Sequence, residues 1–431
     1  MKLAPMFCNN VVLLRDSECN IWGESNTDVI ITVDGVTVTA KPVDGKFTAK
    51  LKPHSAGGPY TLKAEGDGEI IELESVYFGE VFLASGQSNM AFTLGNLPQE
   101  LDNTDQVVRM FTYERPWSMV NSPSTDMRWL DICQANAGAI SAAASHFAIE
   151  LANTLKIPVG IVCNAQGASN VQSWISPETL CNDEAFVSSG YVYNAEKDFV
   201  FNQNNYLYIN SLTKVAPYTV RGVLWYQGEG NTEDPTTPIY AHLFELLLQD
   251  WYKLWDNKDL PFITVQIAPL EVEPHVTWEH LIEQQLIVYK TLKNVGMVTT
   301  ADIGNQHDVH PKEKKILGKR LAKYALGMIY GFDGEYRPPY CEKMTVDGNT
   351  AVLKFANAGD GLYQTKELEF IVVDQDGTTA VGEYEIKGDT VKVKADGAIP
   401  AEVRFAFKGW GEVFLYNSIG MPSSPFRITA K

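Results

Sequence analysis

The sequence predicts an α/β protein in which a mostly parallel β-sheet carries helices on both faces and is flanked by two all-β regions. In residues 76–335, short apolar runs alternate with amphipathic segments of helical length, the pattern of repeated strand–helix–strand units. Residues 1–75 and 336–431 instead contain short strand-like runs separated by turn-forming residues. A chain of 431 residues is also too long for one ordinary hydrophobic core. We therefore expect an N-terminal β-sandwich, a central α/β domain and a C-terminal β region with these boundaries.

The N-terminal region contains a strong hairpin signal. Residues 30–39 alternate apolar and polar side chains around the pair Asp34-Gly35, and such a pair between alternating runs favours a tight turn between two strands. Strand-like runs at residues 46–51 and 60–64 follow at short spacing. These runs together predict a small β-sandwich without clustered chemistry.

The central region contains six apolar runs that predict buried strands. Repeated strand–helix–strand units imply parallel strands with helices on both faces of the sheet. Ser141 is a suitable cap for one helix, and Pro311 suits the first position of the last helix, where the N–H that proline lacks is not needed. The expected strands cover residues 77–84, 107–112, 158–163, 220–226, 261–268 and 295–300, and the expected helices cover residues 140–155, 240–255, 278–292 and 311–330.

The C-terminal region returns to the strand pattern after Pro338 and Pro339. Four strand-like runs are separated by Asp-Gly and Gly-Asp turns, which predicts a second all-β region. The runs cover residues 351–355, 368–373, 391–394 and 402–407.

Composition and charge limit the possible functions. A chain with 45% apolar and 20% charged residues is typical of a folded, soluble protein. Its net charge of −18 argues against nucleic acid or an anionic membrane as partner, because both require a cationic face. The six cysteines are scattered without a CxxC pair, no signal peptide follows Met1, and no apolar run reaches about 18 residues. We therefore expect the cysteines to be free thiols in a reducing compartment. We expect the protein to be cytoplasmic, unless a leader has been removed.

A serine follows the first expected strand of the central region. The strand breaks into Ser85-Gly86-Gln87-Ser88-Asn89, and Gly86 can adopt backbone angles that allow a sharp turn. Open α/β sheets bind ligands beyond the carboxyl ends of their strands, so the hydroxyl of Ser88 is expected at a ligand-binding edge. The alternative is that Ser88 only caps a helix.

Three further strand ends carry polar clusters. Residues 164–170 include Gly167, whose backbone N–H could approach a ligand closely because glycine lacks Cβ. Residues 227–231 include Gln227, a side-chain amide beside a glycine turn and a suitable donor toward an oxyanion. Residues 301–311 contain two histidines and two aspartates. Four such strand ends in one chain indicate an active site more strongly than one.

His310 has the properties of a catalytic base. It precedes Pro311, which disfavours helical angles, so it is expected in an extended loop ahead of the last helix. Asp308 lies two residues earlier and leaves an extended segment on the same side, where its carboxylate could fix the imidazole tautomer. In the alternative arrangement, Asp308 accepts N–H bonds from the first helical turn and His310 is solvated.

These residues together resemble the SGNH-hydrolase superfamily, in particular its sialate O-acetylesterase branch of carbohydrate esterases. Residues 86–90 (GQSNM) are similar to the nucleophile block of that branch, and residues 225–229 (WYQGE) with Asn231 are similar to its third block. Residues 308–311 (DVHP) are similar to its histidine block. The resemblance covers most of the chain and implies a flavodoxin-like sheet for the central domain.

The resemblance also implies a function and roles for single residues. The chain would be a serine esterase that removes O-acetyl groups from sugars without a metal or cofactor. Ser88 would be the nucleophile, His310 the base and Asp308 the residue that orients the base. The oxyanion would be bound by the backbone N–H groups of Ser88 and Gly167 and by the Gln227 side chain. The remaining members of the expected oxyanion and substrate-binding set are Gln87, Glu229 and Asn231.

Two departures from the family pattern leave alternatives open. The superfamily usually places its acid three residues before the histidine, a position that His307 occupies here. Asp302 is therefore a rival to Asp308, and a dyad without an acid is a third possibility. The second block often has paired glycines, whereas this chain has Gly167-Ala168.

The sugar is open as well. O-acetylated sialic acid is the first expectation, and its carboxylate would require a cation, for which Arg109, Arg115 and Arg128 are candidates. The alternatives are an acetylxylan or oligosaccharide acetylesterase, a lipid or small-ester hydrolase, and an inactive carbohydrate-binding protein on the same scaffold. The sequence does not specify an oligomeric state.

Overall fold

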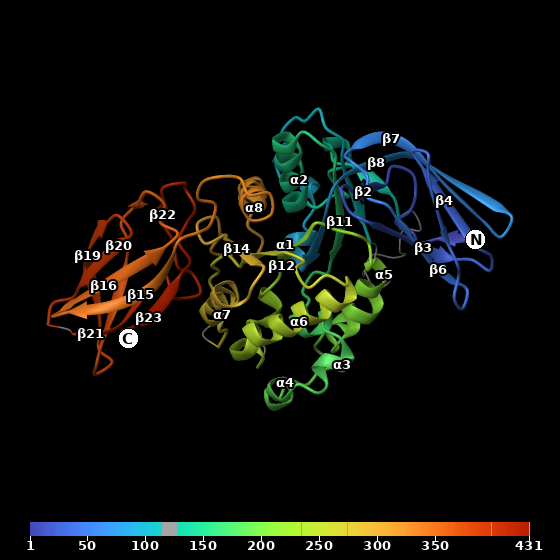
Figure 1. Cartoon of the computed structure of the whole chain (residues 1–431). Helices are drawn as coiled ribbons and strands as arrows, with labels where there is room; N and C mark the ends of the chain where they lie inside the picture. Colours follow the sequence, from blue (N-terminus) through green and yellow to red (C-terminus); the bar gives the residue numbers. More distant parts are fainter. Residues whose placement is uncertain (114–126, 234, 274, 398, 431) are drawn as a thin grey trace.

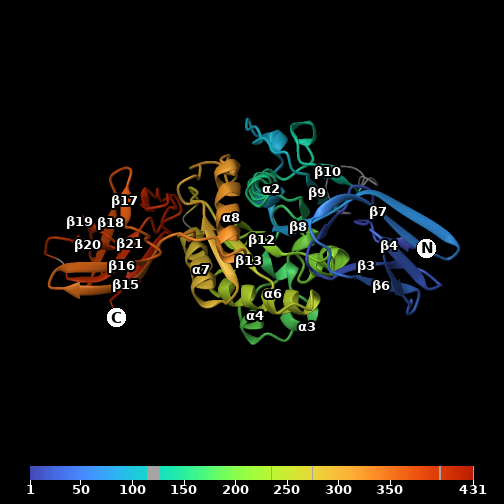
Figure 2. The same cartoon turned by 45° about the horizontal axis from the view of Figure 1, so that its top comes forward.

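The computed structural model describes residues 1–113, 127–233, 235–273, 275–397 and 399–430. A central α/β domain lies between two β domains, which stand at opposite ends of the molecule (Figures 1 and 2). The α/β class and the two flanking β regions that the sequence predicts are confirmed.

The central sheet has the strand order β10-β9-β11-β8-β12-β13-β14. All neighbouring pairs from β9 to β14 are parallel, and β10 is antiparallel to β9. All six expected strands are present, within a few residues of the expected limits except for the much longer β8. The strands are β8 (Glu69–Gly86), β9 (Val108–Thr112), β10 (Trp129–Asp131), β11 (Val159–Ala165), β12 (Gly222–Tyr226), β13 (Phe262–Gln266) and β14 (Val295–Thr299).

Four long helices cover the two faces of this sheet. Helices α2 (Ala142–Leu155) and α8 (Lys314–Met328) pack against each other on one face, and α6 (Tyr240–Leu254) and α7 (Trp278–Thr291) lie on the other (Figure 1). The Ser141 side chain caps α2 by accepting a hydrogen bond from the Ala144 N–H at 3.2 Å, as the sequence predicts. The short helices are α1 (Ser88–Ala91), α3 (Pro177–Leu180), α4 (Glu184–Ser188) and α5 (Thr213–Val215).

The strand order places a crevice at the carboxyl end of β8. The chain leaves β8 toward β9 and β11 on one side, and later crosses to β12, β13 and β14 on the other. Strands that follow β8 therefore flank it on both sides, and their connections diverge at its carboxyl end. Ligands of open α/β sheets bind at such a reversal of strand order.

The N-terminal domain is continuous with the central sheet. Strand β8 runs through the expected boundary at residue 75, pairing first with β7 and then with β11 and β12. The hairpin at Asp34 and Gly35 is confirmed, with φ angles of 46° and 74°. The other strands are β1 (Lys2–Leu3), β2 (Val12–Leu14), β3 (Cys19–Glu24), β4 (Val29–Val33), β5 (Val36–Ala40), β6 (Lys46–Leu51) and β7 (Gly57–Gly66).

The C-terminal domain has a hydrophobic core of its own, whereas the N-terminal and central domains share one. It consists of an antiparallel seven-stranded sheet and a two-stranded sheet. Its strands are β15 (Tyr340–Asp347), β16 (Thr350–Ala356), β17 (Leu362–Gln364), β18 (Phe370–Asp374), β19 (Thr379–Lys387), β20 (Thr390–Lys394), β21 (Pro400–Phe405), β22 (Leu415–Asn417) and β23 (Phe426–Thr429).

The prediction that Pro311 opens the last helix is wrong, because α8 begins at Lys314. The Lys314 N–H donates to the Lys312 carbonyl at 2.7 Å, a tight turn that precedes the helix. The Asn89 side chain holds the Val309 carbonyl at 3.0 Å, which fixes the segment before Pro311 at the edge of the sheet. The loop that carries His310 is therefore longer than expected.

Candidate active site

A cavity of about 710 Å³ opens at the carboxyl edge of the central sheet, at the crevice beside β8. Its lining comes from the segments that follow β8, β11 and β12, from the loop before α8, and from residues 199–201. Ser88, Gly167 and His310 are among the lining residues, so the structure brings together three residues that lie up to 222 positions apart in the sequence. The expected convergence of strand ends at one edge is observed.

The turn that carries Ser88 begins between strands β11 and β12, which pair with β8 up to Gly86. Gly86 has a φ of 123°, and a Cβ there would stand 2.1 Å from the Tyr226 carbonyl oxygen, so only glycine fits. The Gln87 N–H donates to the same oxygen at 2.8 Å. Ser88 is the first residue of α1, whose N-cap is Gln87. The alternative in which Ser88 caps a helix does not describe this turn.

Gly167 lies against Ser88. A Cβ on Gly167 would stand 3.5 Å from the Ser88 Cβ, so a side chain there would project toward the expected nucleophile. Ala168, at the position where the family often has a second glycine, takes a left-handed φ of 57°. This conformation costs roughly 1–2 kcal/mol for a residue with a Cβ, which gives a physical reason for the paired glycines.

His310 presents a buried nitrogen without a partner. Its Nε2 has no hydrogen-bond partner in the part of the chain that the structure describes. Its ring stacks on Phe92 with centroids 5.1 Å apart. Burial lowers the pKa of His310 below its ordinary value, the positive charge of Lys314 lowers this pKa further, and Asp308 opposes both. The neutral imidazole that a general base requires is therefore favoured.

Asp308 is the carboxylate beside His310, although the contact is long. His310 Nδ1 and Asp308 Oδ1 are 3.7 Å apart, beyond a normal hydrogen bond, and the same oxygen accepts the His310 backbone N–H at 2.9 Å. The rival Asp302 is held by Arg320 through two hydrogen bonds of 2.7 Å, and both side chains are buried. His307 faces outward and pairs with Glu271 at 3.1 Å.

The role expected for the Gln227 side chain is wrong. Its Nε2 donates to the Ser169 carbonyl at 3.0 Å and to Asn231 Oδ1 at 2.8 Å, and its Oε1 accepts from the Tyr240 hydroxyl at 2.9 Å. The residue is fully buried. A side-chain amide has two N–H donors, and both are used within the protein, so neither is available for an oxyanion.

Asn231 is also a structural residue rather than a substrate ligand. Its Oδ1 accepts from the Val171 N–H at 2.9 Å, and its Nδ2 donates to Gln172 at 2.9 Å and to Thr236 at 3.0 Å. The side chain is fully buried. Asn231 therefore braces the turn after β12 against the segment that follows β11.

Gln87 and Glu229 line the cavity, but one side-chain oxygen of each accepts hydrogen bonds within the protein. Gln87 Oε1 accepts the N–H groups of Gly228 and Gly230 at 3.2 and 3.1 Å. Glu229 Oε1 accepts from Asn89 Nδ2 at 2.5 Å, and its Oε2 is buried without a partner among the described residues. Burial raises the pKa of Glu229. We therefore assign the Glu229 carboxylate to the support of the site rather than to sugar binding.

Sequence reasoning missed two residues of this support, Asn89 and Lys314. Lys314 is fully buried, and its Nζ donates to Asn89 Oδ1 at 2.6 Å. Burial lowers the pKa of Lys314 to about 7. Lys314 belongs to the run KEKK at residues 312–315, a composition typical of an exposed helix start, so its burial has no signal in the sequence.

An exposed aromatic wall borders the cavity and separates it from a second one. Phe199 and Phe201 stack with centroids 5.0 Å apart, and Phe199 is 44% exposed. Phe199 also lines an adjoining cavity of about 740 Å³, whose other lining residues include Asn170, Tyr191 and Asn202. The two cavities share four lining residues and together make up a recess, and the volume of each is within the range of ligand-binding pockets.

Of the arginines considered for a substrate carboxylate, the two described ones, Arg109 and Arg128, are not in the lining of this recess. Arg109 lies near the amino end of β9, where it binds Asp131 and the carbonyls of Asn10 and Ser75. Arg115 lies outside the described residues, and Arg128 lies just before β10. Within the described lining of both cavities, no lysine or arginine is present.

Two further observations concern other kinds of site. In the described residues, no group of three or more His, Cys, Asp or Glu side chains could hold a metal ion. No helix of the described ranges is long and apolar enough to cross a membrane.

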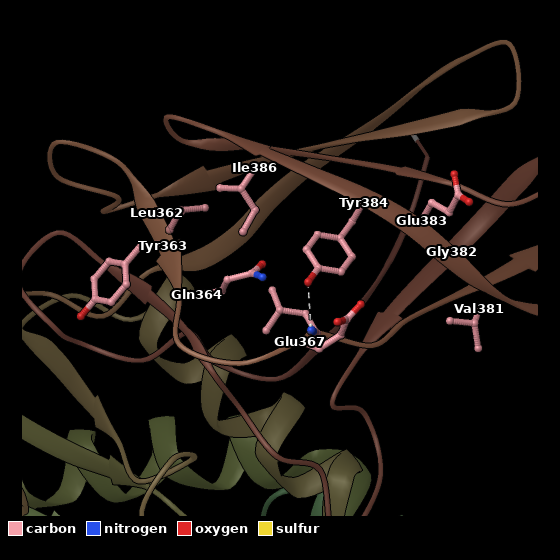
Figure 3. Close-up of a pocket in the computed structure, with 10 residues that line it drawn as sticks. Leu362, Tyr363, Gln364, Glu367, Val381, Gly382, Glu383, Tyr384 and Ile386 are labelled. Carbon is pink, nitrogen blue, oxygen red and sulfur yellow. Dashed lines mark hydrogen bonds between the residues drawn. The ribbon is translucent and has the colours of Figure 1, made fainter.

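A larger groove of about 860 Å³ lies in the C-terminal domain (Figure 3). It is formed by residues 362–368 and by strand β19, with Gln364, Glu367 and Tyr384 among its lining. None of the site residues expected from the sequence lies in it.

Comparisons with known proteins find similar sequences and a similar structure. The sequence profile of the family described as "Carbohydrate esterase, sialic acid-specific acetylesterase" matches residues 78–327. The crystal structure of a carbohydrate acetylesterase from Xanthomonas citri is similar to this chain, with a TM-score of 0.87 and 29% identity over 100% of both chains. Two curated relatives, the sialate O-acetylesterases of Homo sapiens and Mus musculus, are each 24% identical over 77% of this chain and 71% and 74% of their own lengths.

Proposed function

This chain belongs to the sialic acid-specific acetylesterase family of carbohydrate esterases, and from that membership we propose that it hydrolyses O-acetyl esters of sugars with Ser88 as nucleophile. One observation carries the proposal: Ser88, Gly167 and His310 line one cavity at the carboxyl edge of the sheet, and His310 Nε2 has no hydrogen-bond partner among the described residues. A serine with a base and backbone donors around one cavity is the arrangement that acyl transfer requires.

The reaction would proceed through an acetyl-enzyme. His310 Nε2 accepts the Ser88 proton as Oγ attacks the acetyl carbonyl carbon, because serine is a weak nucleophile at its own pKa. The backbone N–H groups of Ser88 and Gly167 stabilise the tetrahedral oxyanion, each by about 3–4 kcal/mol of barrier. The sugar hydroxyl leaves with the proton from His310. A water molecule, deprotonated by His310, then attacks the acetyl-enzyme and releases acetate.

Asp308 would orient the base. A movement of about 0.5 Å would bring the 3.7 Å separation from His310 Nδ1 into hydrogen-bond range. Catalytic hydrogen bonds are often long without substrate and shorten in the complex. The carboxylate would then hold the tautomer that leaves Nε2 free to accept the Ser88 proton.

The sugar has two candidates. The names of the family and of the human and mouse relatives support O-acetylated sialic acid. A specific observation favours an uncharged acetylated oligosaccharide, such as a xylo-oligosaccharide: the described lining of the recess offers no lysine or arginine for a carboxylate. The aromatic rings of Phe199 and Tyr191 and the asparagine amides in the lining can contact the ring of either sugar, so they do not favour one of the two candidates.

A fluorophosphonate probe tests the nucleophile, and a substrate panel tests the sugar. The probe should label the wild type and the exposed-serine control Ser188→Ala equally, and should not label Ser88→Ala. Labelling of Ser88→Ala at the wild-type level would overturn the nucleophile, and an unlabelled wild type would favour the binding-protein alternative. Acetate release from acetylated sialic acids and from acetylated xylo-oligosaccharides would then identify the sugar class.

A further inference from the structure

The Asn89 side chain connects three of the segments that build the active site. Asn89 follows Ser88 directly, and its Nδ2 donates to Glu229 Oε1 at 2.5 Å and to the Val309 carbonyl at 3.0 Å. Its Oδ1 accepts from Lys314 Nζ at 2.6 Å. The turn of Ser88, the turn after β12, the loop of His310 and the start of α8 therefore meet at one buried amide.

Lys314 supplies the hydrogen-bond donor for the oxygen of that amide. Both hydrogens of Nδ2 are donated and Oδ1 accepts from the ammonium, so the amide is matched to its partners in only one orientation. With the amide reversed, Oδ1 would face the Glu229 carboxylate and the Val309 carbonyl, both of which are acceptors. The lysine thereby satisfies Oδ1 in the one orientation in which Nδ2 donates to the backbone carbonyl of the residue before His310.

We propose that Lys314 is a positioning residue of the esterase: through Asn89 it holds the loop that carries His310 against the turn that carries Ser88. The inference rests on the proposed function, since it assigns Lys314 a part in the same reaction. Lys314 is not in the lining of the cavity and acts behind it.

Packing alone does not explain a lysine at this position. Residue 314 is fully buried and is the first residue of α8, and both low polarity and a helix N-terminus disfavour a positive charge. An apolar side chain would fill the same space without that penalty. The charged form is favoured by the Glu229 and Asp308 carboxylates and by the Tyr226 ring, whose centroid lies 5.2 Å from Nζ.

Lys314 also acts on His310 by its charge. Phe92 stacks on the His310 ring at 5.1 Å, and Lys314 Nζ lies 5.7 Å from the centroid of the same Phe92 ring. The charged groups around His310 are Asp308 on its own loop, Lys312 paired to Asp308 at 3.8 Å, Lys314 from α8, and Glu229 behind Asn89. After burial, Lys314 is the largest cause that lowers the pKa of His310.

The test is the pH profile of ester hydrolysis by Lys314→Met in the full chain. Without the ammonium the buried Asn89 Oδ1 loses its donor, and the amide that joins the loop of His310 to the turn of Ser88 is held less firmly. The kcat on 4-nitrophenyl acetate should therefore fall about 10- to 100-fold with a small change in KM. The acid limb of kcat/KM should move to higher pH, because the positive charge that lowers the pKa of His310 is gone. The control Lys315→Met removes the neighbouring lysine, which pairs with Asp102 at the surface, and should leave kcat and the acid limb unchanged.

A second variant covers the case in which Lys314→Met does not fold. Lys314→Arg keeps the charge, but its planar guanidinium is bulkier than the ammonium and displaces the amide, so kcat should fall while the acid limb stays in place. Wild-type kcat in either folded variant would overturn the inference. Failure of the proposed function would look different, because Ser88→Ala would then retain its labelling and activity whatever Lys314 does.

Discussion

The active-site cavity and the C-terminal groove differ in how their polar groups are held. The groove is the larger of the two, at about 860 Å³ against about 710 Å³. Its carboxylates Glu367 and Glu383 are exposed to solvent, and its Tyr384 hydroxyl accepts the Leu368 N–H at 3.1 Å (Figure 3). The lining of the cavity instead includes His310, whose buried Nε2 has no hydrogen-bond partner in the described part of the chain. Volume alone therefore does not separate an active site from an inert groove. A buried polar group with an unmet hydrogen bond is the better sign of an active site.

The topology of the two domains explains this difference. Parallel strands bring their carboxyl ends, and the loops that follow them, to one edge of the sheet, so residues distant in the sequence converge there. The antiparallel sheets of the C-terminal domain send alternate strand ends to opposite edges. The groove is formed by β17 of the two-stranded sheet, by residues 367–368 and by β19 of the seven-stranded sheet, and its lining contains no residue of the central domain.

The largest expected effect is loss of the nucleophile. Ser88→Ala should lower the hydrolysis of 4-nitrophenyl acetate by at least about 10³-fold, because the covalent step is lost while oxyanion binding remains. Initial rates measured against Ser188→Ala, an exposed serine in α4, provide the comparison. Wild-type activity in Ser88→Ala would contradict the assignment of ester hydrolysis to the cavity rather than to the groove.

Substitutions at Asp308 and Asp302 should affect different quantities, kcat for Asp308 and the free energy of unfolding for Asp302. Asp308→Asn should lower kcat by roughly 10- to 10³-fold, because the amide no longer stabilises the protonated imidazole. Asp302→Asn breaks a buried ion pair with Arg320 and should cost about 3–5 kcal/mol of unfolding free energy, with kcat per folded molecule unchanged. Kinetics and urea unfolding of both variants test the assignment, and a greater loss of kcat in Asp302→Asn would reverse it.

The pH dependence of activity should reflect the burial of His310. A general base is active when neutral, so kcat/KM should fall as pH decreases through the pKa of the free enzyme. Because burial and Lys314 lower this pKa, the acid limb should lie below pH 6.5, the ordinary value for histidine. Initial rates between about pH 4 and 8 measure it, and an acid limb above 6.5 would contradict the environment described for His310.

The sequence predicts the convergence of strand ends better than the direction of their side chains. Runs of apolar residues locate strands, and parallel strands must share an edge, so Ser88, Gly167 and His310 could be expected together. The amides of Gln227 and Asn231 lie in turns, where neither a period of two nor a helical period fixes which way a side chain points. They reach sideways to Ser169 and Val171, which only the packing of two turns determines.

Lys314 and the domain boundary could not be predicted for a related reason. Lys314 is buried by Asn89, a residue 225 positions away in the chain, whereas its neighbours in sequence are charged and exposed. Strand β8 was expected to begin near residue 77 and instead begins at Glu69, because its first half pairs with β7 of the N-terminal domain. Both features depend on contacts between segments that are distant in the sequence.

A smaller effect is expected at the aromatic wall between the two adjoining cavities. Phe199→Ala should raise KM for acetylated oligosaccharides about tenfold by removing an apolar face that packs on the sugar. Neither kcat nor KM for 4-nitrophenyl acetate should change, because that ester does not reach the second cavity. An equal rise of KM for both substrates would show that Phe199 shapes the acetyl site rather than the sugar site.

The smallest expected effect is in the C-terminal groove. Tyr384→Phe removes the acceptor for the N–H of the buried Leu368 and should cost about 1 kcal/mol of unfolding free energy. Ester hydrolysis should keep its wild-type kcat and KM, since the groove shares no residue with the active-site cavity. Urea unfolding and initial rates on acetylated oligosaccharides measure the two quantities. A rise of KM for the oligosaccharides alone would mean that the groove binds the sugar chain. The active-site cavity would then carry out the reaction, and the groove would hold the substrate.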